Sequence, residues 1–266
     1  MNASRHASQR STSDDSALRI ALVTGGAMGI GAAIASTLAA DGFMVAIADI
    51  NLDAARAHAA AIDAAKGSAC ALYLDAADPS SIDAAFAEIE KTFGRCDVLI
   101  NNAGIAGVAS FLDCPLDVWS RVLATNVTGP MLCGQRAARS MSTHSWGRIV
   151  NIASISGVRA SAGRTAYGTS KAALIGLTRQ MAVELAEAGI TVNAISPGPI
   201  ETPLTRDHHS AETRNGYHRT VPMRRYGEPS DIAGTVSFLC SERAGYITGH
   251  MVAVDGGFLA AGILDI

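Results

Sequence analysis

Short apolar runs alternate with longer amphipathic stretches along nearly the whole chain from residue 18 onward. This alternation is typical of repeated strand–helix–strand units. Most of the apolar runs are continuous, as expected of strands that helices cover on both faces of a sheet. The expected strands are residues 19–23, 43–48, 69–74, 96–101, 147–153, 190–196 and 250–254. The pattern predicts an α/β fold with a parallel sheet flanked by helices.

The segments between these strands predict the helices of the fold. Pro79 and Pro229 each follow an acidic residue and suit the first turn of a helix. The expected helices are residues 29–41, 52–66, 79–93, 115–141, 165–188 and 229–241. No internal repeat or low-complexity linker divides the chain, so we expect residues 18–266 to form one domain.

Residues 197–222 do not fit the alternation. They begin with Pro197-Gly198-Pro199, end with Val221-Pro222, and are polar in between without an apolar stripe of helical period. We interpret them as a mobile flap that contains one short helix and could cover a ligand.

The composition excludes several classes of protein. Hydrophobic residues make up 48% of the chain and charged residues 17%, which favours a packed core over disorder. A net charge of −3 provides no basic face for a phosphate backbone, so nucleic acid is not an expected partner. No run approaches the roughly 18 apolar residues of a membrane span, and the N-terminus lacks the apolar core of a signal peptide. We therefore expect a cytoplasmic protein that does not bind membranes.

The cysteines and histidines indicate neither a disulfide framework nor a metal site. The five cysteines are scattered and show no C-x-x-C spacing, which indicates a reducing compartment. We interpret His208, His209 and His218 of the flap as surface residues, so no metal is expected. Residues 1–17 are polar, serine-rich and aperiodic, and they predict a disordered N-terminal tail.

A glycine-rich turn follows the first expected strand, where residues 24–31 read TGGAMGIG. Glycines at such a turn let a pyrophosphate approach the N-terminus of the next helix, where free N–H groups favour an anion. Asp49 ends the second strand 18 residues after Gly31, close to the spacing of about 20 at which a carboxylate binds a ribose diol. That carboxylate would repel the 2′-phosphate of NADP, and neither Met28 nor Ile50 supplies a cation. The sequence therefore favours NAD, although a role for Asp49 at the start of the next helix is the alternative.

The ends of the third and fourth expected strands carry further candidates. Asp75 could accept a hydrogen bond from the adenine amino group, or could form a turn or cap before Pro79. The sequence Asn101-Asn102-Ala103-Gly104 ends the fourth strand, and its small residues would let the backbone approach adenine and ribose; the alternative is an ordinary turn.

Ser154, Tyr167 and Lys171 form the reacting end of the expected site. Tyr167 and Lys171 are four residues apart in an expected helix, so they lie on one face with the ammonium beside the phenol. A phenol has a pKa of about 10, and a neighbouring cation favours the phenolate. The spacing therefore predicts a tyrosine that acts as an acid or base, beside a hydroxyl donor.

These motifs, together with Asn126, the YGTSK run at 167–171 and Pro197-Gly198, resemble the classical short-chain dehydrogenase/reductase family over about residues 18–258. The resemblance implies one Rossmann-like domain with a seven-stranded parallel sheet, and hydride transfer on the B face of the nicotinamide. It implies that Tyr167 is the general acid/base, that Lys171 lowers its pKa and holds the nicotinamide ribose, and that Ser154 orients the substrate oxygen. Asn126 would hold a water molecule that links Lys171 to solvent.

The same resemblance implies a set of residues around the cofactor. Residues 197–202 would pack on the nicotinamide, with Thr202 near its carboxamide. Ala76 departs from the family, which more often has a branched residue after the aspartate, and this puts minor contacts in doubt. The implied cofactor-binding residues are Gly25, Met28, Gly29, Ile30, Gly31, Asp49, Ile50, Asp75, Ala76, Asn102, Ala103, Gly104, Tyr167, Lys171, Pro197, Gly198, Ile200 and Thr202.

The sequence thus indicates an NAD-dependent oxidoreductase that interconverts a secondary alcohol and a ketone. Polyols, cyclic alcohols, hydroxysteroids and 3-oxoacyl thioesters all stay open, and the missing cation near Asp49 argues against an NADPH-driven acyl reductase. A silent dinucleotide sensor is the alternative of another class, but it would be expected to have lost Tyr167 or Lys171. Candidates for the substrate pocket are Arg159, Ser161, Arg164, Leu204 and Tyr217. Asp255-Gly256-Gly257 resembles the end of the family, where subunits commonly meet, so a homotetramer is expected.

Overall fold

The computed structural model describes residues 18–262, apart from the side chains of Leu204, Asp207 and His208. The predicted tail, residues 1–17, lies outside the described residues. So do the side chains of the substrate candidate Leu204 and of His208.

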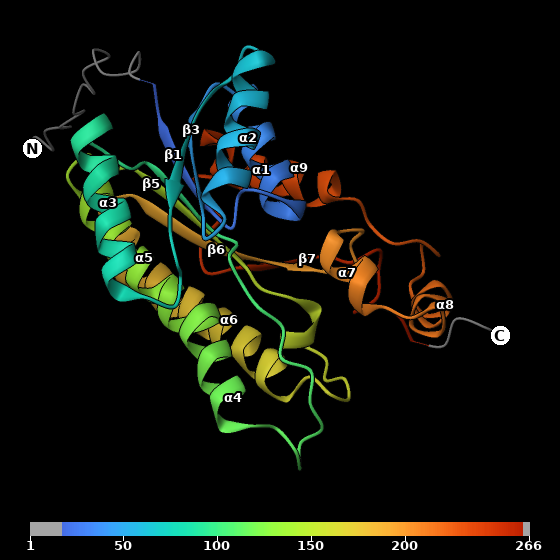
Figure 1. Ribbon diagram of the computed structural model, residues 1–266. Helices are drawn as coiled ribbons and strands as arrows, with labels where there is room; N and C mark the ends of the chain where they lie inside the picture. Colours follow the sequence, from blue (N-terminus) through green and yellow to red (C-terminus); the bar gives the residue numbers. More distant parts are fainter. Residues whose placement is uncertain (1–17, 263–266) are drawn as a thin grey trace, which may run out of the picture.

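Seven parallel strands form one sheet in the order β3-β2-β1-β4-β5-β6-β7 (Figure 1). This confirms the predicted α/β fold and its seven-stranded parallel sheet. The strand order reverses between β1 and β4, and ligands of such sheets bind at the carboxyl ends of the strands beside this point. The strands are β1 Ile20–Thr24, β2 Met44–Asp49, β3 Ser68–Tyr73, β4 Val98–Asn101, β5 Gly147–Ile152, β6 Ile190–Pro197 and β7 Met251–Val254.

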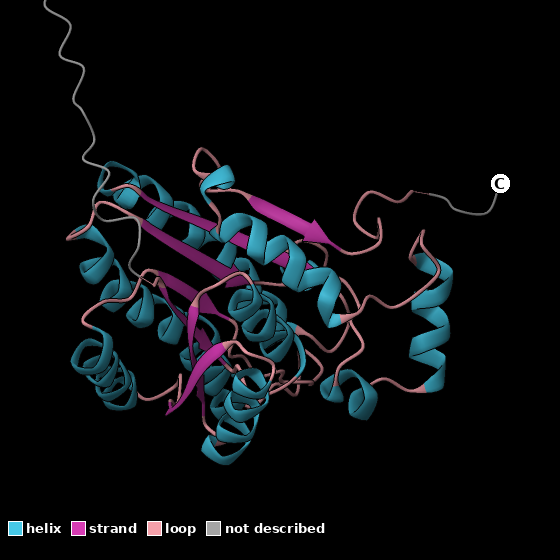
Figure 2. Cartoon of the chain, turned by 90° about the horizontal axis from the view of Figure 1, so that it is seen from above, coloured by secondary structure: helices cyan, strands magenta, loops and turns pink. Residues whose placement is uncertain are grey.

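Helices cover both faces of the sheet, so that the strands lie between two helical layers (Figures 1 and 2). One layer contains α1 Gly29–Ala40, α2 Leu52–Ala64 and α9 Pro229–Cys240. The other contains α3 Pro79–Phe93, α5 Gly129–Ser142 and α6 Thr165–Leu185. Each layer forms its own apolar core against the sheet. Strands β1, β4, β5 and β6 are buried at every position, and most of their residues are apolar because both faces are covered.

The helix expected at residues 115–141 is interrupted. It consists of α4 Leu116–Leu123, a π-helical turn at Ala124–Thr128, and then α5. The prediction of one continuous helix was wrong because a π turn inserts a single wide turn without a visible change in apolar pattern. Gly129, after the turn, lies so close to the carbonyl oxygen of Ala76 that an added Cβ would be 2.2 Å from it.

The flap contains two helices, α7 Pro203–His208 and α8 Ala211–Thr220, rather than the single short helix that we expected. Side chains cap both of them, since Thr202 accepts a hydrogen bond from the Thr205 N–H and Ser210 accepts one from the Thr213 N–H. None of the described residues of α8 is buried, which explains the missing apolar stripe. Both helices lie beyond the carboxyl end of the sheet (Figure 1).

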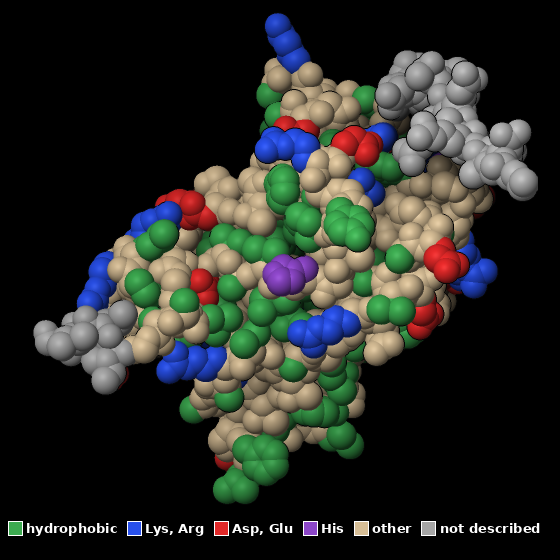
Figure 3. Space-filling model, turned by 180° about the vertical axis from the view of Figure 1, so that it is seen from behind, with side chains coloured by type: hydrophobic (Ala, Val, Ile, Leu, Met, Phe, Trp, Pro, Cys, Tyr) green, Lys and Arg blue, Asp and Glu red, His purple; other side chains and the backbone are tan. Residues whose placement is uncertain are grey.

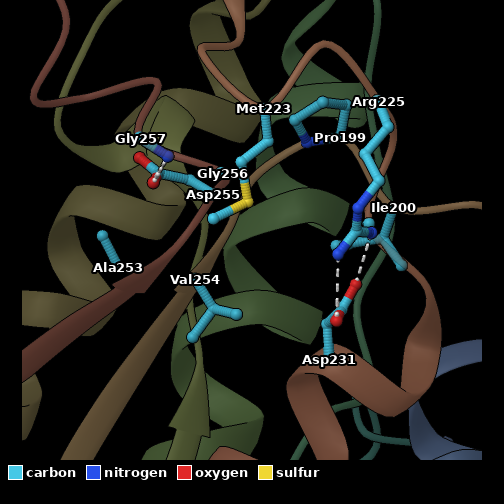
Figure 4. A pocket seen from close by; sticks show the side chains of 11 residues that line it. Pro199, Ile200, Met223, Arg225, Asp231, Ala253, Val254, Asp255, Gly256 and Gly257 are labelled. Carbon is cyan, nitrogen blue, oxygen red and sulfur yellow. Dashed lines mark hydrogen bonds and ion pairs between the residues drawn. The ribbon is translucent and has the colours of Figure 1, made fainter.

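The two ends of the flap meet beside β7, around a cavity of about 350 Å³ (Figure 4). Arg225 and Asp231 point toward each other across one side of it and form an ion pair at 2.8 Å. On the other side, the backbone N–H of Met223 donates to the carbonyl of Gly256. These contacts fix the hinge ends of the flap to the sheet.

The surface carries dispersed charge. On the face that Figure 3 shows, basic side chains are separated from one another, and several lie next to acidic ones. Within residues 18–262, no helix is both long enough and apolar enough to cross a membrane.

We expect Gly129→Ala to destabilise the protein by about 1–3 kcal/mol, because the new methyl group meets the Ala76 carbonyl in a packed interior. Urea unfolding measures this change. Gly234→Ala is the matched control, since nothing lies within 4 Å of its added Cβ in α9. Alanine there should stabilise the helix by about 0.5–1 kcal/mol. Equal effects of the two variants would contradict the proposed steric cause.

Candidate active site

A cleft of about 790 Å³ opens at the carboxyl ends of the strands, where the strand order reverses. It is lined by the glycine-rich turn, the ends of β2, β3 and β4, the start of α6, and the segment that enters the flap. All of the cofactor-binding residues implied by the sequence lie in this lining except two. Gly198 packs against Asp255, and Ile200 lines the cavity of Figure 4.

The lining also includes residues that the sequence did not single out. Arg121 and Thr125 enter the cleft from α4 and the π-helical turn, and the unforeseen interruption of that helix explains why they were missed. Leu74 and Ala77 are the sequence neighbours of Asp75 and Ala76, which the sequence had indicated, so adjacency along the chain could have identified them. The remaining additions are Asn51, Ile105, Ala106, Ile152, Ala153 and Pro203.

The glycine-rich turn is compact and is fixed to β4. Gly25 and Gly29 have positive φ angles of 61° and 58°, which residues with a Cβ rarely adopt. A Cβ on Gly31 would lie 2.1 Å from the carbonyl oxygen of Gly25. The Asn102 side chain donates to the carbonyls of Thr24 and Gly25, at 3.0 and 2.9 Å. The turn therefore presents the N-terminus of α1 to the cleft as a ready anion site.

Asp49 lies at the end of β2, beside this turn. Its carboxylate accepts hydrogen bonds from the backbone N–H groups of Ala27 and Asn51, at 3.1 and 2.9 Å. The neighbouring side chains of Met28 and Ile50 are apolar and more than half exposed. Asn51 itself caps α2, so the helix-capping role does not depend on Asp49. The carboxylate is thus held at the cleft without a neighbouring cation from these segments.

Asp75 forms a local turn after β3. One of its carboxylate oxygens accepts from the N–H of Ala77 at 2.8 Å, and its own N–H donates to Ser81. The cap of α3 is Asp78 instead. Asp75 therefore has the turn role that we considered, and it also lines the cleft.

Ser154, Tyr167 and Lys171 come together at the end of β5 and the start of α6. Ser154 is buried and caps a short 3-10 helix, Ile155–Gly157. Tyr167 lies in the first helical turn of α6 and forms a hydrogen bond with Ser154. The ammonium of Lys171 lies 5.7 Å from the centroid of the Tyr167 ring. The three residues that the sequence spacing singled out therefore lie together in space.

The π-helical turn places Asn126 inside the protein, on the other side of Lys171. Its side chain accepts from the N–H of Ile105 at 2.9 Å and donates to the carbonyl of Ile105 at 3.0 Å. An added Cβ on Gly104 would lie 3.3 Å from the Asn126 oxygen and 3.4 Å from the Lys171 nitrogen. Asn126 and Lys171 thus face the same glycine, at the floor of the cleft.

The histidines of the flap pack with aromatic side chains. His209 stacks on Tyr217 and contacts the hydroxyl of Tyr226 at 2.9 Å, and His218 lies against the Tyr226 ring. Among the described residues, no group of three or more histidine, cysteine, aspartate or glutamate side chains could hold a metal ion.

Comparisons with known proteins agree with this geometry. A family model described as Enoyl-(Acyl carrier protein) reductase matches residues 25–259. The 3-oxoacyl-(acyl-carrier-protein) reductase FabG of Aquifex aeolicus is 42% identical over 240 residues, covering 90% of this chain and 96% of that protein. Nodulation protein G of Azospirillum brasilense is 40% identical over 240 residues, covering 90% and 97%. The chain belongs to the short-chain dehydrogenase/reductase family.

Solved structures of the family show the same fold. A short-chain type dehydrogenase/reductase from Mycobacterium marinum superimposes with a TM-score of 0.87 at 35% identity, covering 91% of this chain and 96% of that one. As a short-chain dehydrogenase/reductase, the protein is an oxidoreductase that uses a nicotinamide dinucleotide.

The pKa of Tyr167 is raised, whereas the resemblance to the family implied that Lys171 lowers it. Burial raises the pKa of the phenol, while the hydrogen bond with Ser154 and the charge of Arg164 lower it. We had expected Lys171 to lower the pKa, but its ammonium donates to the carbonyl of Ile152 at 2.7 Å, and burial lowers its own pKa to about 8. Desolvation of the phenol therefore outweighs the effects of Ser154 and Arg164.

We expect Tyr167→Phe to reduce kcat by about 10²–10⁴-fold, the usual contribution of a positioned acid or base. Steady-state rates measure the loss, and calorimetric titration with dinucleotide serves as the control, since binding should persist. Activity close to that of the wild type would remove the phenol from this role.

Lys171 should make stability depend on pH. Its pKa is lower in the folded protein than the usual 10.5, so the folded state binds fewer protons between pH 8 and 10.5, and stability rises with pH in that window. We expect the unfolding free energy of the wild type, relative to Lys171→Met, to increase by about 3 kcal/mol across the window. Urea unfolding at pH 7.5 and 10 tests this. Lys91→Met is the control, since it changes an exposed lysine and keeps Lys171, and it should retain the pH dependence of the wild type.

Proposed function

We propose that the protein interconverts a 3-oxoacyl thioester and its 3-hydroxy form by NAD-linked hydride transfer. The observation that carries the proposal is that Tyr167 and Lys171 line the cleft, with Ser154 next in sequence to Ala153 of the lining and beside Tyr167. The substrate class is supported by the relatives, several of which are named 3-oxoacyl-(acyl-carrier-protein) reductases. We therefore propose the thioester, which the sequence had left as an alternative, as the substrate in preference to free alcohols.

The residues at the cleft fit a nicotinamide dinucleotide. A Cβ at Gly25 would fall 2.9 Å from the Cα of Ala103, so these two segments approach as closely as a bound pyrophosphate requires. The glycine-rich turn would hold the phosphates, Asp49 the adenosine ribose and Lys171 the nicotinamide ribose. When bound, the nicotinamide gives or accepts hydride at the carbon of the substrate.

The side chains of the chain move the proton and orient the substrate. In ketone reduction, Tyr167 donates its proton to the substrate oxygen while Ser154 donates a hydrogen bond to the same oxygen. In alcohol oxidation, the tyrosinate accepts that proton. A donor placed where charge develops is worth about 2.7–4 kcal/mol in other enzymes. Lys171 donates to the carbonyl of Ile152 and Asn126 donates to the carbonyl of Ile105, so both side chains are anchored in the buried floor of the site.

The two directions use different protonation states of Tyr167. Reduction uses the protonated phenol, and burial raises the pKa of this group. Oxidation uses the phenolate and should accelerate as the pH increases. Reduction is the direction that the names of the relatives support.

NAD is the cofactor that the site favours. Asp49 would accept from the ribose hydroxyls of NAD, and it would repel the 2′-phosphate of NADP. The cations in the cleft lining, Lys171 and Arg121, come from α6 and α4, whereas Met28 and Ile50 flank the carboxylate.

We further propose a cytoplasmic homotetramer. All five cysteines are unpaired, and Cys96, Cys133 and Cys240 are buried, as suits a reducing compartment. β7 is an edge strand whose described residues keep partial exposure, although parallel sheets are normally covered. A second subunit at this edge would cover it.

The test compares cofactor and substrate together. We expect the purified protein to reduce the N-acetylcysteamine thioester of 3-oxobutanoate with NADH, and kcat/KM with NADPH to be at least about tenfold lower, since the charge repulsion costs about 1.4 kcal/mol or more. Thermal unfolding should show stronger protection by NAD than by NADP.

Asp49→Ser is the variant that tests the cofactor preference, because it removes the charge and leaves a hydroxyl in place of the carboxylate. It should reduce the preference for NAD. Equal protection of the wild type by both dinucleotides would contradict the role of Asp49. Turnover of simple secondary alcohols without turnover of the thioester would contradict the substrate class, and a screen of NADH formation across alcohols would then identify the substrate.

A further inference from the structure

Two arginines of the loop before α6 each lie against an aromatic ring. The guanidinium of Arg164 lies 5.6 Å from the centroid of the Tyr167 ring, and that of Arg159 lies 5.2 Å from the centroid of Phe258. The ring of Tyr217, from α8, is 6.1 Å from that of Phe258. Aromatic side chains of α6, α8 and the C-terminal segment thus surround this loop.

Neither arginine has a carboxylate partner within the described part of the chain. Their recorded side-chain contacts are the aromatic rings. Other arginines near the flap do have carboxylate partners: Arg214 pairs with Glu201, and Arg225 pairs with Asp231. A guanidinium presents a fork of donors that matches carboxylate and phosphate oxygens.

The backbone around both arginines is tied down. The loop that carries them is joined to the loop after β4, because the N–H of Ala109 donates to the carbonyl of Gly163 at 3.2 Å. Arg164 accepts from the N–H of Gly168 at 2.6 Å at the start of α6, and Arg159 donates to Ile155 at 2.8 Å. Arg164 is also half-buried. These bonds fix the backbone that carries the two arginines, while the side chain of Arg159 is exposed.

We propose that Arg159 and Arg164 form an anion subsite that binds a carboxylate or phosphate group of the substrate while its carbonyl oxygen lies at Ser154 and Tyr167. The apolar part of the substrate would pack on Tyr217 and Phe258. The subsite rests on the proposed function and narrows its substrates to anionic 3-oxo compounds. A carboxylate close to the ketone and the phosphates of a carrier arm are the two possible sources of the charge.

Matched substrates separate the charge from the rest of the molecule. The first pair is 3-oxobutanoate and its neutral methyl ester. The second is the coenzyme A thioester of 3-oxobutanoate, which carries phosphates, and the neutral N-acetylcysteamine thioester. We measure kcat/KM with NADH and thermal protection of the NAD complex for the wild type, Arg164→Gln, Arg164→Lys and Arg159→Gln. Arg139→Gln removes an exposed positive charge from the distant end of α5 and is the control.

We expect Arg164→Gln to lower the ratio of anionic to neutral kcat/KM by about tenfold or more, as the loss of a charged hydrogen bond implies. Arg159→Gln should lower the ratio less, and Arg164→Lys should retain most of it. A lower ratio for 3-oxobutanoate and its methyl ester assigns the anion to a carboxylate. A lower ratio for the two thioesters assigns it to a phosphate.

If Arg164→Gln leaves the ratio of anionic to neutral kcat/KM unchanged, the subsite is overturned. A role of Arg164 only in the pKa of Tyr167 would lower kcat/KM equally for both substrates of a pair. The subsite would also be overturned if the wild type neither reduced the anionic substrate of each pair faster than the neutral one nor gained more thermal protection from it. Failure of both thioesters with retained activity on 3-oxobutanoate would refute the proposed thioester substrate and leave the subsite supported.

Discussion

The hydrogen bonds between the glycine-rich turn and the end of β4 are the constraint on which the site depends. The Asn102 amide bonds two carbonyls of the turn, and the Thr24 hydroxyl accepts from the N–H groups of Asn102 and Ala103 while it donates to Ile100. These bonds join two strands at the point where the sheet order reverses. They fix the N-terminus of α1, and with it one wall of the cleft, relative to the catalytic end.

The second constraint is the buried polar floor. Lys171 is almost fully buried, and its ammonium is satisfied by a backbone carbonyl of β5. Asn126, which is fully buried, bonds both backbone groups of Ile105 and the hydroxyl of Ser170. Burial lowers the pKa of the ammonium and raises that of the phenol, so the two shifts have one physical cause.

The proposed substrate subsite draws on segments that are distant in the sequence. The loop before α6, the flap helix α8 and the C-terminal segment would contribute Arg164, Tyr217 and Phe258 in turn. The cofactor side, in contrast, is formed by consecutive strand ends. This division explains why the same fold accepts one cofactor class with different substrates: loops can change while the strand ends stay in place.

The sequence by itself determined the parallel α/β fold, because continuous apolar runs and glycine-rich turns are local patterns with few structural solutions. It also determined the meeting of Ser154, Tyr167 and Lys171, since strand end and helical spacing fix their relation. It did not reveal the π-helical turn before Gly129 or the second helix of the flap, because neither changes the apolar period. Only the tertiary structure decided the direction of the Tyr167 pKa and left Arg159 and Arg164 without a carboxylate partner among residues 18–262, because desolvation and ion pairing depend on which distant segments pack around a charge.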